Sequence, residues 1–170
     1  MISTNLFPQS TGALLSDCGQ YRYTLTREWD EGRPALTFIM LNPSTADATL
    51  DDPTIRRCIG FARDRGFGGL RVLNLFAFRA TDPAHMKAAQ DPVGPDNDIH
   101  LIAALTAAAA ANAPVIAAWG THGAHNGRAA EVRELALQYG VELMCLGATR
   151  DGHPRHPLYV KADQEFVNLT

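Results

Sequence analysis

The chain has 170 residues, of which 46% are hydrophobic, and a formal net charge of −3 at pH 7. This length and composition fit a single globular domain over residues 1–170 and argue against intrinsic disorder. Proteins dedicated to long nucleic acids usually carry a basic excess, which this chain lacks. The composition therefore excludes a strongly basic protein, although clustered arginines still allow a local basic patch.

The sequence shows no feature of a membrane or secreted protein. It has no run of about 18 apolar residues, and residues 1–5 lack the basic start typical of a signal peptide. Its three cysteines cannot form a complete disulfide set, and Cys58 and Cys145 lie in apolar patterns that indicate buried free thiols. We therefore expect a cytoplasmic protein without membrane association.

Predicted strands and helices alternate along the chain. In chain order they are a strand at 20–29, a turn at 30–34, a strand at 35–41, a helix that opens at 51–53, a strand at 70–76, a loop rich in Pro and Asp at 81–96, an alanine-rich helix at 97–112, a strand at 114–119, a helix at 127–139 and a strand at 141–146. Strands that alternate with helices imply right-handed parallel crossovers. The predicted fold is therefore three-layer α/β/α, with a mainly parallel central sheet and an N-terminal antiparallel hairpin.

Four of these strands lead into polar or glycine residues. The motifs that follow them are Asn42-Pro43-Ser44, Asn74, Trp119-Gly120 and His153-Pro154-Arg155-His156-Pro157. In open α/β sheets, ligands bind at the carboxyl ends of the strands. The sequence therefore predicts that these four motifs assemble into one site.

The two asparagines each have a functional and a structural interpretation. Asn42 can orient a water or a substrate amide, or it can simply close a turn while Ser44 or Thr45 caps a short helix. Asn74 places an amide in an apolar strand, where an unpaired amide costs on the order of a few kcal/mol. A partner must satisfy it, either the neighbouring backbone or a ligand, and we expect a ligand.

The late loop carries two His-Pro pairs. Proline restricts its own backbone and that of the residue before it, so His153 and His156 are held in extended conformation. An imidazole held in this way can donate a hydrogen bond to developing negative charge. The alternative is a proline-braced surface loop.

No cofactor is expected, and a metal site is only a weak alternative. Gly66-Phe67-Gly68-Gly69 precedes a strand instead of following one, which does not fit a phosphate-binding loop. Helix capping already explains two of the three clustered carboxylates. The candidate metal ligands would be Asp47, Asp51, Asp52, His122 and His125.

The order of the motifs resembles an uncharacterised family of bacteria and phages, a domain of unknown function, over nearly the whole chain. The motifs are Asn42-Pro43-Ser44-Thr45-Ala46-Asp47, Asp52-Pro53-Thr54-Ile55-Arg56-Arg57, Asn74-Leu75-Phe76-Ala77 and His156-Pro157-Leu158-Tyr159. More distantly, the pattern resembles the uracil-DNA glycosylase superfamily. There a first strand ends in a catalytic Asp-Pro or Asn-Pro, a second carries a base-reading Asn, a third ends in Trp-Gly and a late loop bears His-Pro.

The resemblance implies a uracil-DNA-glycosylase-like fold and a set of residue roles. Asn42 would position the attacking water, and Asn74 would read the Watson–Crick edge of an extruded base. His156, or His153 if the loop aligns differently, would stabilise charge on the leaving base. Further substrate contacts are expected from Pro43, Ser44, Asp47, Phe76, Trp119, Arg155, Leu158 and Tyr159.

The expected function is that of a hydrolase with N-glycosylase-type chemistry, acting on a nucleobase, a nucleotide or nucleic acid, including DNA. One alternative is a non-catalytic module that binds a modified base or nucleotide. A weaker alternative is a metal-dependent hydrolase. The base and the oligomeric state stay open at this point.

Overall fold

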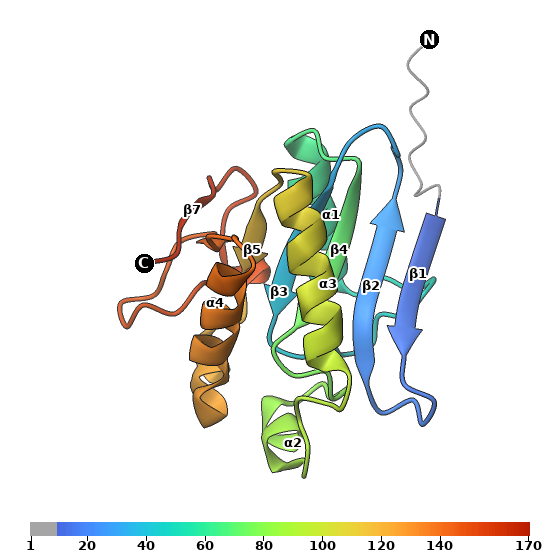
Figure 1. Cartoon of the computed structure of the whole chain (residues 1–170), viewed down its shortest axis with the longest axis vertical. Coiled ribbons are helices and arrows are strands. Elements are labelled where there is room, and N and C mark those ends of the chain that lie inside the picture. The colour runs from blue at the N-terminus through green and yellow to red at the C-terminus, as the bar shows by residue number, and fades with distance from the viewer. Residues whose placement is uncertain (1–9) are drawn as a thin grey trace.

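A sheet of seven strands forms the centre of the molecule in the computed structural model, which describes residues 10–170 (Figure 1). The strands are Ser10–Leu15 (β1), Arg22–Glu28 (β2), Ala35–Met40 (β3), Gly69–Asn74 (β4), Val115–Ala117 (β5), Met144–Cys145 (β6) and Val167–Asn168 (β7). They lie in the order β1-β2-β4-β3-β5-β6-β7. The fold is therefore α/β, as predicted.

The sheet is mixed, which corrects the prediction of a mainly parallel sheet. The neighbours β4, β3, β5 and β6 run parallel, whereas the pairs β1–β2, β2–β4 and β6–β7 are antiparallel. The antiparallel pairs arise because the N-terminal strands and the C-terminal strand add to the two edges of the parallel centre. The hairpin also differs from the predicted one: it is formed by β1 and β2, since β4 lies between β2 and β3.

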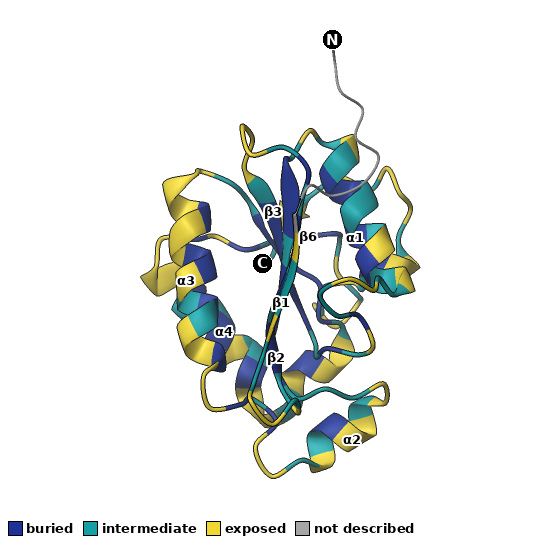
Figure 2. Ribbon diagram, turned by 90° about the vertical axis from the view of Figure 1, so that its right-hand side faces the viewer, coloured by how far each residue is buried: buried dark blue, intermediate teal, exposed yellow. Residues whose placement is uncertain are grey.

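Helices cover both faces of the sheet (Figure 2). Helix α1 (Pro53–Asp64) packs on one face, and α3 (Asn97–Ala110) and α4 (Arg128–Gln138) pack on the other. A short helix α2 (Pro83–Ala88) lies in the segment predicted as a loop, because Asp82 accepts the Ala84 N–H as N-cap and Pro83 begins the first turn. Two 3₁₀ helices, Thr121–Gly127 (η1) and Pro157–Tyr159 (η2), follow β5 and β6 along the chain.

Helix α1 begins where the sequence predicts. The Asp52 carboxylate accepts the N–H of Ile55 at 2.9 Å, and Pro53 occupies the first turn. Its inner face buries Ile55, Cys58 and Phe61 against the sheet, and burial of each large apolar side chain contributes about 1.5–3 kcal/mol. The other face of the sheet has a separate core against α3 and α4. The start of α1 is thus fixed both by its cap and by its packing.

The order of the strands creates a switch point in the sheet. From β3 the chain crosses through α1 to β4 on one side, and it later crosses through α3 to β5 on the other side of β3. In such sheets the loops at the carboxyl ends of the central strands diverge and leave a crevice. The topology therefore places a crevice where β3, β4 and β5 end, at the end of the sheet where α2 lies (Figure 1).

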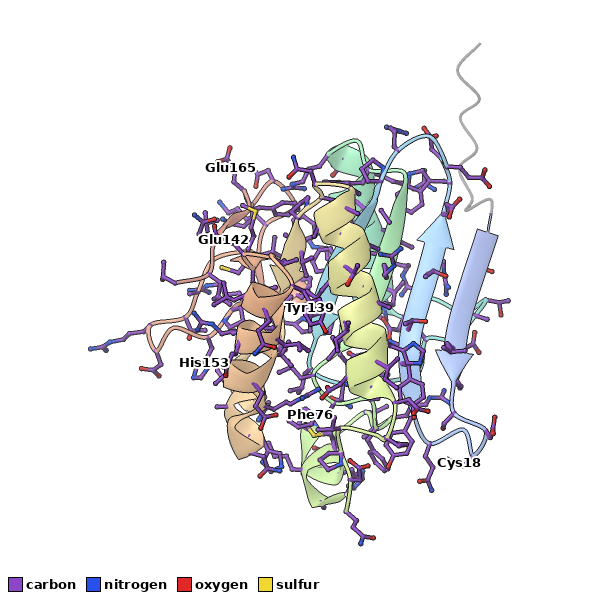
Figure 3. The ribbon with its side chains drawn as sticks, viewed as in Figure 1. Cys18, Phe76, Tyr139, Glu142, His153 and Glu165 are labelled. Carbon is purple, nitrogen blue, oxygen red and sulfur yellow. The ribbon has the colours of Figure 1, made fainter. Side chains whose placement is uncertain are left out.

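The three cysteines are free. Cys58 and Cys145 are buried, as predicted, and burial raises the pKa of both thiols. Cys18 is exposed in the turn between β1 and β2 (Figure 3). Among residues 10–170, no helix has the length and apolar character needed to cross a membrane.

Candidate functional site

A cavity of about 730 Å³ opens at the carboxyl ends of β3, β4 and β5. This volume lies within the range of roughly 300–1,000 Å³ that is usual for small-molecule sites. The wall combines segments that are distant in sequence: the start of β2, the ends of β3, β4 and β5, the first turn of α1, and the loop that enters η2. Residues from all four strand-end motifs therefore lie at one cavity.

Most of the residues expected at the site line this cavity. They are Asn42, Ser44, Asn74, Trp119, Arg155, His156, Leu158 and Tyr159. All four strand-end motifs contribute to the wall. Leu158 and Tyr159 lie at its exposed rim, and the side chain of Tyr159 is one of the most exposed large hydrophobic groups in the described chain.

Four expected residues lie outside the wall. The Asp47 carboxylate accepts the N–H groups of Thr49 and Leu50, which closes a local turn and holds the pKa of Asp47 below its usual value. Pro43 is buried, and its carbonyl accepts the Ala80 N–H. The other two are Phe76 and His153.

Phe76 and His153 lie in other parts of the structure, away from the wall of the cavity (Figure 3). Phe76 lies in the core beneath α3 and α4, with its ring 5.8 Å from that of His125. His153 belongs to a turn in which its carbonyl accepts the Thr149 N–H and its own N–H is donated to the Thr149 hydroxyl. Of the two loop histidines, the structure thus brings only His156 to the cavity.

Asn74 is buried at the end of β4 without any hydrogen bond to its side chain. It is 1% exposed, it lines the cavity, and neither Nδ2 nor Oδ1 has a partner among the described residues. A buried polar group left unpaired costs about 1–3 kcal/mol. A ligand with a matching acceptor and donor would remove this cost.

Asn42 uses one end of its amide for structure. Its Nδ2 donates to the carbonyl of Ala80 at 2.8 Å and also approaches the carbonyls of Pro43 and Phe78. These bonds tie the end of β3 to the segment after β4. Only Oδ1 of this side chain is left to accept a hydrogen bond from a ligand or a water.

His156 has one ring nitrogen engaged and one free. Its Nδ1 accepts the Leu158 N–H at 3.2 Å, which assigns the proton of the neutral ring to Nε2. Burial lowers the pKa of His156, although the charge of Asp52 acts in the opposite direction. The half-buried imidazole is thus held neutral at pH 7, with Nε2–H as a donor for the cavity.

Sequence reasoning missed Arg22, which lines the cavity from β2. This side chain is 3% exposed, its Nη1 donates to the Ala46 carbonyl at 2.7 Å, and its Nε has no partner. Burial lowers the pKa of Arg22 to about 10, while the charges of Asp52 and Asp47 partly offset this effect. Asp52 also lines the wall; because a helix N-cap accounts for an Asp at this position, no separate signal in the sequence marks it as a cavity residue.

The residues of the metal alternative do not form one site. Asp51 pairs with Arg27 at 2.9 Å, Asp52 caps α1, and Asp47 closes its own turn. His122 Nδ1 lies 2.9 Å from Lys87 Nζ, and His125 lies against Phe76. Within the described chain, no group of three or more His, Cys, Asp or Glu residues could hold a metal ion.

The clustered arginines of α1 are largely engaged in contacts within the molecule. Arg57 donates to the carbonyls of Pro157 and Val160, and Arg65 donates to that of Gln164. The guanidinium of Arg63 lies over the ring of Trp29, 4.2 Å from its centre. These arginines therefore hold the C-terminal segment and the residue after β2 in place.

Comparison with protein families gives one match. Residues 22–158 match the model of a family described as "Protein of unknown function (DUF1643)", which is most of the chain, so the protein belongs to that family. This confirms the expected membership of a family of unknown function. No curated protein and no solved structure matches the chain.

Proposed function

Because the family has no stated activity, we propose from the cavity itself that the protein binds a nucleobase-containing ligand and hydrolyses its N-glycosidic bond. The observation that carries this proposal is Asn74, whose amide donor and acceptor are both buried, both unpaired, and both at the wall of the cavity. A side-chain amide is complementary to the adjacent donor and acceptor on the edge of a base. Enzymes that act on bases read them by such contacts in an enclosed pocket.

The free atoms of Asn42 and His156 suit glycosidic hydrolysis. The C1′–N bond breaks with its electron pair going to the base, the oxygen of a water bonds to C1′, and a proton from that water ends on the departing base. Asn42 Oδ1 accepts a hydrogen bond from this water, and His156 Nε2–H donates to the negative charge that develops on the base. Preorganised groups of this kind each lower the barrier by about 2–4 kcal/mol.

We also propose that the site is arranged as in the uracil-DNA glycosylases that the sequence resembles. The motifs that resemble this superfamily come from four segments of the chain, and residues from each of them line one cavity: Asn42, Asn74, Trp119 and His156. Their strands β3, β4, β5 and β6 form the parallel centre of the sheet. This convergence supports a shared layout of the site, within a sheet whose edges are antiparallel.

Base release tests the proposal. The purified protein is incubated with nucleosides, nucleotides, and single- and double-stranded oligonucleotides that bear uracil, mismatched or modified bases, and free base is measured by chromatography. We expect release that is lost in Asn42→Ala and His156→Ala. His153→Ala is the matched control, since it removes a histidine of the same loop that lies outside the wall.

A non-catalytic binding module is the second candidate. This candidate is favoured by the hydrogen bonds of Asn42. Its Nδ2 donates to backbone carbonyls, so the residue has a structural role in the loop that does not require catalysis. Binding of a base-containing ligand that Asn74→Leu abolishes, without release of base, would establish this candidate. If neither binding nor release is found across the panel, both candidates are wrong.

A further inference from the structure

We propose that Arg22 is an anion-binding residue of the cavity, and that the ligand is a nucleotide whose phosphate it binds, not a free base or a nucleoside. The inference rests on the proposed function for the base and adds the class of substrate. It starts from a comparison of the three arginines that are buried in the described structure, Arg22, Arg27 and Arg128.

Two of these buried arginines have a complete set of acceptors. Arg27, 1% exposed, pairs with Asp51 at 2.9 Å and donates to several backbone carbonyls, including that of Asp47. Arg128, 4% exposed, pairs with Asp98 at 2.5 Å and donates to the carbonyl of Leu75 at 2.9 Å. Each buried charge is thus neutralised by a carboxylate within the fold.

Arg22 is the exception. Within residues 10–170 it forms no ion pair, and the Ala46 carbonyl is the only acceptor of its guanidinium. A buried charge is strongly unfavourable unless a counter-charge and hydrogen bonds compensate it. The planar guanidinium fork matches the oxygens of a phosphate, so an anionic ligand in the cavity would supply the counter-charge and the acceptors that Arg22 lacks.

The local backbone directs Arg22 toward this cavity. The register of β1 and β2 shifts after the pair Leu14–Thr24, so that Leu15 lies opposite Arg22. Because of this irregularity, Arg22 contacts the loop that leads to α1, on the same face as Leu25, three residues further on. Bulges of this kind commonly re-aim a side chain beside a functional site.

Arg22 and Asn74 are close enough in the sheet to serve one ligand. Their strands β2 and β4 are neighbours, with Leu25 opposite Val72, and the Arg22 N–H donates to the Ala77 carbonyl. Both side chains line the same cavity, whose volume suits a mononucleotide. One end of the ligand would be read by the Asn74 amide and the anionic end by Arg22.

The phosphate has two sources, a free mononucleotide or a nucleotide within a nucleic acid chain. The negative net charge favours the free nucleotide. The experiment therefore measures, by calorimetry, the affinity of nucleosides, matching 5′-monophosphates, inorganic phosphate and short single-stranded oligonucleotides. It uses the wild type, Arg22→Met, Arg22→Lys and the control Arg71→Met, which removes an arginine of β4 that does not line the cavity.

For the wild type and for Arg71→Met, we expect a 5′-monophosphate to bind at least about tenfold more tightly than its nucleoside, the size of one charge-assisted hydrogen bond. This preference should vanish in Arg22→Met and remain in part in Arg22→Lys, with thermal unfolding confirming that each variant is folded. Binding to oligonucleotides alone, with the same dependence on Arg22, would retain the phosphate contact and identify a polymer as its source.

Other outcomes would separate this inference from the proposed function. Equal affinity for nucleosides and monophosphates would overturn the phosphate contact and leave base binding intact. A preference for monophosphates that survives in Arg22→Met would overturn the assignment to Arg22. Phosphate binding that depends on Arg22, without any affinity for bases, would retain the anion site and contradict the proposed function.

Discussion

At the scale of single residues, the cavity wall holds buried polar atoms without hydrogen-bond partners: Nε of Arg22 and both amide atoms of Asn74. Arg22 and Arg27 lie on the same strand and are buried to a similar extent, yet only Arg27 has a carboxylate partner. A fold selected for stability alone would have paired or replaced both. The contrast makes their substitutions informative as a pair.

We predict that Arg22→Met leaves the free energy of unfolding of the ligand-free protein unchanged within about 1 kcal/mol, or raises it, because it removes an unpaired buried charge. Arg27→Met should instead cost on the order of 3 kcal/mol, since it leaves Asp51 and several carbonyls without their donor. Equilibrium unfolding in urea measures both values. A loss for Arg22→Met as large as that for Arg27→Met would show that Arg22 serves the fold and not a ligand.

His156 leads to a prediction about pH. Its pKa in the folded protein lies below the usual value of 6.5, so the unfolded chain binds more protons than the folded one as the pH falls below about 6.5. The contribution of His156 to stability is therefore complete above pH 6.5. It declines on acidification until the pH passes the folded pKa, below which it is constant.

His156→Asn isolates this effect, because the new side-chain oxygen can still accept the Leu158 N–H. We expect the stability difference between wild type and variant to be constant above pH 6.5 and to shift in favour of the variant as the pH is lowered below 6.5. Unfolding in urea at a series of pH values measures it. A difference that is independent of pH would mean that His156 titrates alike in the folded and unfolded chain.

At the scale of elements, helix α1 holds the loop that carries His156. Arg57 donates to the carbonyls of Pro157 and Val160, so it secures both ends of η2. Its neighbour Arg56 is exposed and donates only to the carbonyl of Asp51 near its own helix. The two arginines are adjacent in sequence but serve different segments.

We predict that Arg57→Ala increases amide hydrogen exchange in residues 156–160 and weakens ligand binding severalfold, whereas Arg56→Ala changes neither. The reason is that the loop loses its anchor while the residues of the cavity remain present. Hydrogen exchange by mass spectrometry measures the first effect. Unchanged exchange in Arg57→Ala would show that the two prolines alone hold the loop.

Helices and strand ends were the predictable elements of this fold. Asp52-Pro53 predicts the start of α1, and apolar runs that stop at polar residues predict β3, β4 and β5. These signals are local, so a single sequence contains them. The segments β1, β7 and α2 were not predicted, because each is short or depends on the edge to which it pairs.

Arg22 shows why part of the site was beyond prediction. Regular alternation along 20–29 puts Arg22 on the face opposite Leu25, away from the cavity. The shift of register against β1 brings both to one face, and it depends on a pairing between strands that a pattern along one strand does not reveal. Asn74 was predictable because an amide in an apolar strand is unusual, and this signal can be read without any knowledge of how the strands pair.

At the scale of the whole molecule, the topology and the charge point to a small ligand. The crossovers on the two sides of β3 open one crevice at the carboxyl ends of the central strands, and the cavity found there encloses polar groups in its floor. The net charge of −3 also favours a small ligand over a long nucleic acid, because dedicated nucleic-acid binders usually carry a basic excess.

This distribution of charge predicts a weak dependence of binding on salt. A protein that neutralises about 6–10 phosphates of a duplex loses about 10³–10⁵-fold in affinity between 50 and 200 mM salt, because each contact releases a condensed counterion. A mononucleotide held by one buried guanidinium has no such counterion layer and is shielded from the solvent ions. We therefore expect its affinity to fall by no more than about threefold over the same range, as measured by calorimetry. A steep loss, together with tight binding of long duplex DNA at low salt, would instead indicate that the surface around Arg155 and Tyr159 is the principal binding face.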